Sequence, residues 1–197
     1  MDTNLLIGLI SFAFATSITP GPNNLMLMAS GANFGFRRSL LHMLGVNLGF
    51  ASLVLVAGLG LASLIAAFPS AQILLKIAAT AYLIWLAWKI AHAAVPKAGS
   101  VAGRPITVTQ AAAFQWVNPK AWAMALGAVS AYTGDGDLAS ILRVVVVFSL
   151  VNLPCIAAWT LAGEALRHVL TNPNRLALFN WTMAALLVLS LYPVLNL

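Results

Sequence analysis

The sequence predicts an all-α, polytopic membrane protein, and two features of its composition lead to this prediction. Hydrophobic residues make up 61% of the 197-residue chain and charged residues 7%, whereas a soluble domain has about 45–50% and about 25%. Ten basic and four acidic residues are too few to cover a surface that faces water. The composition therefore argues against a soluble enzyme domain, a disordered chain and a coiled coil.

Six apolar segments follow one another, and each is long enough to cross a bilayer. A bilayer core about 30 Å thick needs about 20 helical residues at about 1.5 Å per residue. The segments cover residues 3–36, 43–68, 72–91, 107–132, 144–163 and 176–197. The sequence therefore predicts six transmembrane helices in a single domain. An alternative with five spans stays open, in which the first or the fourth segment is re-entrant, because prolines interrupt both.

The basic residues predict the orientation of these helices. Seven of them follow the first, third and fifth segments, namely Arg37, Arg38, Lys89, Lys97, Arg104, Arg167 and Arg175. The positive-inside rule places that side in the cytoplasm, so both termini are expected outside. No Lys or Arg precedes Arg37. The first segment therefore lacks the basic region of a cleaved signal peptide, and we expect it to remain as a helix.

Proline interrupts the first and fourth segments at corresponding places. Thr19-Pro20-Gly21-Pro22-Asn23 lies in the first segment and Asn118-Pro119-Lys120-Ala121 in the fourth. Pro20 and Pro119 are 99 positions apart (119 − 20), and the same shift places the second and third segments over the fifth and sixth. A shorter echo joins Val46-Asn47-Leu48-Gly49 to Val151-Asn152-Leu153-Pro154.

These matches predict two three-helix repeats, at residues 1–95 and 107–197, with a cytoplasmic loop at 96–106 between them. Three spans are an odd number, so the second repeat would be inverted relative to the first. Inverted repeats with paired, interrupted helices are typical of secondary transporters, where the interruptions form the substrate site.

Each interruption is expected to expose backbone polar groups. Proline has no N–H, so the carbonyls near Thr16 and Ile18 lose their helical partners. An unsatisfied group in lipid costs several kcal/mol, so such a break survives only inside protein or beside water. New half-helices are expected to start at Pro22 and Pro119 with free N–H groups, with Asn118 in a capping role before the second. Free N–H groups suit a carboxylate and free carbonyls suit an ammonium, which together fit an amino-acid zwitterion. A pair of proline kinks without a ligand is the alternative.

Four stretches of the chain resemble the LysE/RhtB-type amino-acid exporters. They are the two proline motifs, the pair Gly45 and Gly49, and the stretch from Ala81 to Lys89. The resemblance covers nearly the whole chain, and the stretch 81–89 is most similar to cysteine and O-acetylserine efflux members. It implies export of amino acids or close derivatives across the bacterial inner membrane.

The predicted substrate site combines both breaks with the two echoed asparagines. Its residues are Thr19, Pro20, Gly21, Pro22, Asn23, Asn47, Asn118, Pro119, Lys120 and Asn152. Lysine is costly inside a membrane, so Lys120 is expected to contact the substrate carboxylate; the alternative is that it extends to the interface. Asn47 and Asn152 either line the substrate pathway or link helices to each other, and the sequence favours both readings equally. No Asp or Glu lies in the middle of a segment, which favours neutral or small polar amino acids over cationic ones.

Proton-coupled export by alternating access is the predicted mechanism, and a facilitator without ion coupling is its alternative. His42 and Glu164 are the candidate proton-binding residues. Their alternative readings are an interfacial histidine and an interfacial ion pair with Arg167.

Other classes of protein fit the sequence less well. The chain has one cysteine and three histidines, and it contains no HExxH or GxSxG motif, so neither an enzyme nor a metal or cofactor site is expected. A non-catalytic membrane scaffold remains an alternative, although a scaffold has no use for paired breaks. The expected partners are the amino acid and membrane lipid, without nucleic acid, and a homodimer stays open.

With an even number of spans and the N-terminus outside, the C-terminus is also expected outside the cytoplasm. A reporter fused to the C-terminus tests this position. An alkaline phosphatase fusion should therefore be active, and a fluorescent protein that folds only in the cytoplasm should stay dark. The reverse pattern would rule out the six-span arrangement.

Overall fold

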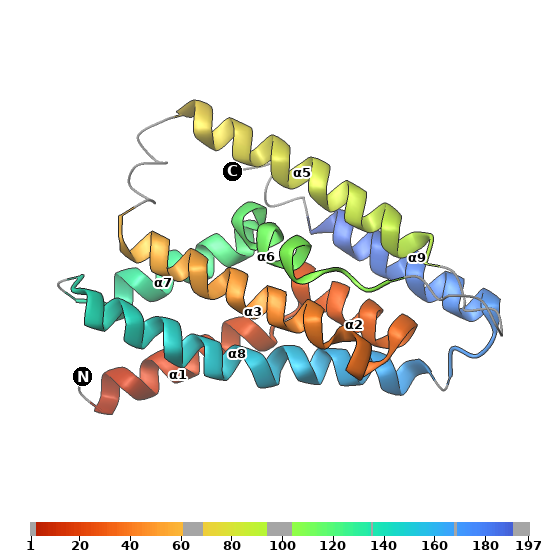
Figure 1. The fold of residues 1–197 in the computed structure, drawn as a ribbon, viewed down its shortest axis with the longest axis horizontal. Coiled ribbons are helices and arrows are strands. Elements are labelled where there is room, and N and C mark those ends of the chain that lie inside the picture. The colour runs from red at the N-terminus through yellow and green to blue at the C-terminus, as the bar shows by residue number, and fades with distance from the viewer. Residues whose placement is uncertain (1–2, 61–68, 94–103, 135, 168, 191–197) are drawn as a thin grey trace.

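The computed structural model is helical throughout the residues that it describes, which are 3–60, 69–93, 104–134, 136–167 and 169–190 (Figure 1). The helices are α1 Thr3–Ile18, α2 Pro22–Phe34, α3 Phe36–Gly58, α5 Pro69–Ala91, α6 Val108–Val117, α7 Pro119–Tyr132, α8 Leu138–Arg167 and α9 Pro173–Leu189. No strand occurs in these ranges. The all-α prediction is confirmed.

Both predicted breaks are present. The first segment divides into α1 and α2, which meet at an angle of 58°. The fourth divides into α6 and α7 at Asn118, whose backbone is extended. Pro22 and Pro119 are the first residues of α2 and α7, where a missing N–H costs no helical hydrogen bond.

Several boundaries differ from the sequence prediction. The second segment was expected to begin at residue 43, but α3 begins at Phe36, and Arg37 and Arg38 lie in its first turn. The turn between α2 and α3 is the single residue Gly35, whose φ of +81° favours glycine. Helix α8 has 30 residues and continues through Pro154, so it is longer than the predicted 144–163. The predicted ends at 61–68 and 191–197 lie outside the described residues.

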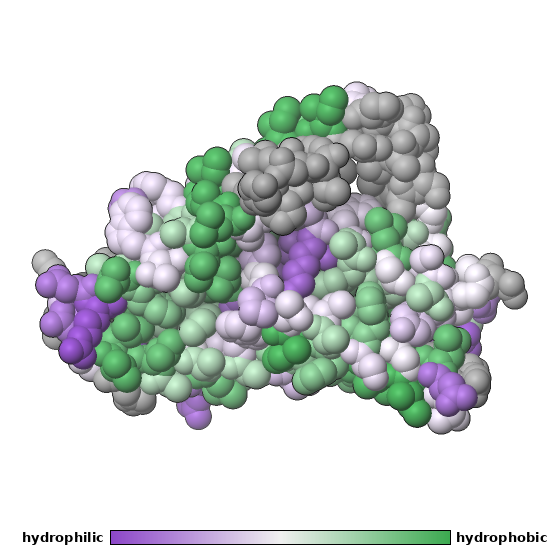
Figure 2. All heavy atoms as spheres, turned by 180° about the vertical axis from the view of Figure 1, so that it is seen from behind, coloured by the Kyte–Doolittle hydropathy of each residue, from purple (hydrophilic) through white to green (hydrophobic). Residues whose placement is uncertain are grey.

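Among the described helices, α3 and α8 are long and apolar enough to cross a membrane, and α1 with α2 qualifies as a third span if the bent pair is counted as one. Large apolar side chains lie on the surface of many helices, for example Ile7, Leu41, Leu150 and Leu178. Figure 2 shows a largely hydrophobic face with hydrophilic residues at both ends of the long axis and a small hydrophilic patch near its middle. This surface fits a lipid environment, whereas the count of six spans remains a prediction.

The long helix of each half packs on the broken helix of the other half. Helix α3 contacts α6 and α7, and α8 contacts α1 and α2. Helices α3 and α8 also pack on each other, while α5 pairs with α9 on one side of the molecule (Figure 1). Helices α3 and α8 therefore pack against both broken helices, while Thr19 and Pro20 in the first break are exposed.

Glycines allow these helices to approach closely. A Cβ atom added to Gly31 of α2 would lie 2.0 Å from the carbonyl oxygen of Thr160, and one added to Gly163 of α8 would lie 2.0 Å from that of Met28. Gly45 and Gly49 of α3 pack in the same way against α6. Gly45 and Gly49 therefore form a close-packing motif between α3 and α6.

Replacing Gly31 with alanine is expected to destabilise the protein, because the new methyl group meets backbone that has no side chain to move aside. The cost should reach the upper part of the range of about 1–3 kcal/mol for overpacking. Thermal unfolding in detergent micelles measures the effect. Gly8→Ala on α1 is the control, since its Cβ would lie 3.4 Å from Tyr132 in ordinary contact. Equal melting temperatures for the two variants would contradict the packing described above.

Candidate functional site

The two breaks lie against each other, and Lys120 joins them. Its Nζ donates to the carbonyl oxygen of Thr19 at 2.6 Å and to that of Pro20 at 3.4 Å. Gly21 leaves room for this side chain, because a Cβ atom there would lie 2.7 Å from the Cδ of Lys120. A lysine from the second half therefore binds the exposed backbone of the first half.

Three carbonyls at and just after the end of α1 have side-chain donors in this structure, namely those of Ser17, Ile18 and Thr19. Asn24 donates through Nδ2 to the carbonyls of Ser17 at 2.8 Å and Thr19 at 2.9 Å. The indole Nε1 of Trp159 donates to the carbonyl of Ile18 at 3.0 Å. The expectation of a free carbonyl is therefore wrong at Ile18, because a side chain from α8 donates to it, and side chains from α2 and α7 also satisfy the carbonyls of Ser17 and Thr19.

The two helices that begin after the breaks, α7 and α2, differ in their N-terminal caps. Asn118 accepts the backbone N–H of Lys120 at 3.1 Å, so it caps α7 as predicted. Helix α2 begins after Gly21, and no side chain caps it. Its first N–H groups and the positive end of its dipole are thus available to an anion.

A cavity of about 30 Å³ lies beside the breaks. At roughly 10–15 Å³ for each water it holds about two or three water molecules, so an amino acid needs a more open form. Five predicted site residues line it, namely Gly21, Asn23, Asn118, Lys120 and Asn152. Ser17 also lines it, and its buried hydroxyl has no hydrogen-bond partner within the described part of the chain. Lys120 is the only charged residue among the described residues that form this lining.

The other five predicted site residues lie around the cavity rather than on its wall. Pro20, Pro22 and Pro119 shape the two breaks. The hydroxyl of Thr19 donates to the carbonyl of Ala15, four residues earlier in the last turn of α1. Asn47 accepts a hydrogen bond from Asn152 at 3.0 Å, so this pair links α3 to α8.

Three pairs of side-chain amides join the two halves. Asn23 and Gln115 exchange two hydrogen bonds of 2.8 and 3.0 Å. Asn33 and Asn180 exchange two of 2.8 and 3.2 Å, and the third pair is Asn47 with Asn152. The sequence interpretation missed Gln115, Asn33 and Asn180, together with the indole of Trp159. An amide inside a long apolar segment was the signal that could have identified the first three.

The two candidate proton-binding residues lie away from the cavity. His42 is fully buried on α3, and neither ring nitrogen has a partner among the described residues. His42 is therefore enclosed by protein. Glu164 of α8 accepts the backbone N–H of Phe36 at 3.1 Å, so it connects α8 to the start of α3.

Comparison with known proteins agrees with this architecture. The family model of the LysE type translocator matches residues 14–190. The chain is 32% identical over 191 residues to the cysteine/O-acetylserine efflux proteins of Escherichia coli K12 and Shigella sonnei strain Ss046, and each match covers 95% of this chain and 96% of the relative. No solved structure matches the chain. With a family model that covers most of its length and efflux proteins as full-length relatives, the chain belongs to the LysE family of translocators.

Proposed function

We propose that the chain exports neutral or small polar amino acids, such as cysteine or O-acetylserine, across the inner membrane. The family and the efflux relatives support amino-acid export. The observation that carries the proposal is the position of Lys120, which places one cation between two helix breaks beside a small cavity.

The chemistry of this position favours a carboxylate ligand. Lys120 and the uncapped start of α2 both attract an anion, and the described lining supplies no Asp or Glu to balance them. The substrate carboxylate would bind Lys120, whose ammonium then leaves the carbonyls of Thr19 and Pro20. The substrate ammonium takes its place on those carbonyls. A cationic side chain would find no acidic partner here, which favours neutral substrates.

The two halves are proposed to work as inverted repeats of six spans in one transporter domain, with both termini outside. The mutual packing of α3 and α8 on the broken helices supports this arrangement. The three amide pairs support alternating access, because each one crosses from one half to the other and can exchange its hydrogen bonds for water.

Proton coupling is the remaining part of the proposal. His42 supports it because a buried imidazole without partners can accept a proton or a water molecule. Glu164 supports it because protonation of its carboxylate would weaken the hydrogen bond to Phe36 that ties α8 to α3.

Replacing Lys120 with methionine should abolish the carboxylate contact. Loss of a charged hydrogen bond of about 1.5–3 kcal/mol predicts that affinity falls about tenfold to a hundredfold. Efflux of O-acetylserine from loaded vesicles and its effect on the melting temperature measure this change, with Lys120→Arg as the charge-conserving control. Substrate should stabilise the parent and not Lys120→Met. If the protein were a scaffold, no amino acid would raise its melting temperature. Equal efflux by Lys120→Met and the parent would rule out the carboxylate site.

A proton gradient directed into the cytoplasm should accelerate efflux if the exchange is coupled. We expect His42→Gln or Glu164→Gln to lose this acceleration while exchange of labelled for unlabelled substrate continues. The measurement is efflux at several external pH values with the membrane potential clamped. Efflux by the parent that responds to neither pH nor potential would favour the facilitator without ion coupling.

A further inference from the structure

One face of α2 runs from the central cavity to a second, larger one. Asn23, Met26, Ser30 and Asn33 are spaced by three, four and three residues, so they share a helix face. Asn23 lines the central cavity, whereas Met26, Ser30 and Asn33 line a second cavity of about 280 Å³. The two cavities therefore have a common wall.

The second cavity is basic. Lys89 of α5 and Arg104 line it together with His92, and no Asp or Glu belongs to the described lining. The guanidinium of Arg38 lies 5.5 Å from the ring centre of Phe34, another lining residue. This end of α2 joins the turn that precedes Arg37 and Arg38, the side that the positive-inside rule places in the cytoplasm.

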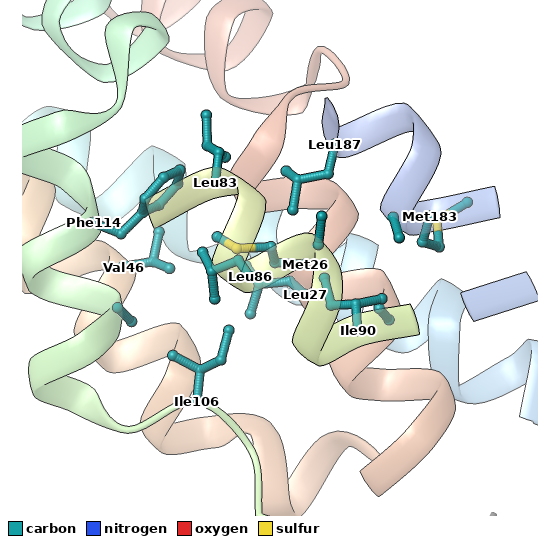
Figure 3. Close-up of a cluster of buried hydrophobic side chains, with 14 of the residues drawn as sticks. Met26, Leu27, Val46, Leu83, Leu86, Ile90, Ile106, Phe114, Met183 and Leu187 are labelled. Atoms are coloured by element: carbon teal, nitrogen blue, oxygen red, sulfur yellow. The ribbon is translucent and has the colours of Figure 1, made fainter. Parts of the chain in front are cut away.

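A closed apolar layer separates the two cavities. Met26 is 2% exposed and packs in one buried cluster with Leu27, Val46 and Leu86 (Figure 3). Val46 lines the central cavity and Leu86 lines the second, so this cluster occupies the space between them. A zwitterion cannot cross an apolar layer without a large desolvation cost.

Resting on the proposed amino-acid export, we infer that the second cavity is the cytoplasmic vestibule of the transport path and that Met26 is its gate. The substrate carboxylate first meets Lys89 and Arg104 there. It then moves along α2, past Ser30 and Met26, to Lys120. Methionine suits a gate because its unbranched side chain changes rotamer more easily than a branched one.

The polar wall of α2 favours an amino acid over an anionic lipid as the occupant. A lipid headgroup would be held by Lys89 and Arg104 alone, whereas Ser30 and Asn33 continue the polar face toward the substrate site. A labelling experiment distinguishes the two occupants. An amino acid is a water-soluble solute, so adding it should change the labelling rate, whereas a lipid is a component of the bilayer, so its effect should follow the lipid composition.

Thiol labelling tests the vestibule directly. The background is Cys155→Ser, since Cys155 is the only cysteine, and the test variant adds Ser30→Cys. A membrane-impermeant maleimide should label it in inverted vesicles at least about tenfold faster than in right-side-out vesicles. O-acetylserine should slow the labelling. Thr182→Cys, on an exposed surface of α9, is the control that lipid should protect from the reagent.

Labelling that is equally fast from outside would overturn the vestibule. So would protection that follows the phosphatidylglycerol content of the vesicles and not O-acetylserine, because that result assigns the cavity to lipid.

Kinetics provides a second readout. Lys89→Gln and Arg104→Gln should each raise the KM for efflux about threefold to tenfold with little change in kcat, and Lys89→Arg should restore the parent value. Met26→Ala should increase leak of substrate in the absence of a gradient.

Parent-like kinetics in all of these variants would overturn the vestibule alone. A parent protein that moves no amino acid would overturn the proposed function, and the vestibule with it.

Discussion

A backbone carbonyl that lacks a donor in lipid costs several kcal/mol, and this constraint organises the centre of the protein. Pro20 and Pro22 remove the donors that a continuous helix would have supplied. Asn24, Trp159 and Lys120 donate to the carbonyls around the break, and two of these three donors come from the other half of the chain. Side chains of one half therefore satisfy part of the break in the other, so the packing of the halves stabilises the site.

The same logic explains why the three side-chain pairs that join the halves are amides and not ion pairs. A pair of asparagines or an asparagine with glutamine satisfies its polar atoms internally and stays neutral, so it avoids the cost of burying ions in a chain with few acids. Such pairs contribute modestly, about 0.6 kcal/mol on average in one membrane protein. Links of this strength hold one arrangement of the halves without preventing another, which is what a carrier needs.

Much of this fold is readable from the sequence because proline acts locally. The positions of both breaks and the role of Asn118 as a cap follow from residues within a few positions of each other. The donors to the freed carbonyls do not, since Trp159 is 141 positions from Ile18 and Lys120 is 101 from Thr19. The start of α3 was missed for another reason. Two arginines are typical of a loop, but the positive φ of Gly35 completes the turn in one residue and leaves both arginines on the helix.

The close approach of α2 to α8, at Gly31 beside Thr160 and at Gly163 beside Met28, has a mechanical consequence. Here α2 and α8 meet backbone to backbone, with no side chains between them, so the ridges that usually interlock neighbouring helices are missing at this crossing. The separation of the two helix axes at this crossing is therefore set by backbone atoms, and the size of neighbouring side chains does not determine it. Any side chain introduced at Gly31 or Gly163 would have to push the two halves of the chain apart.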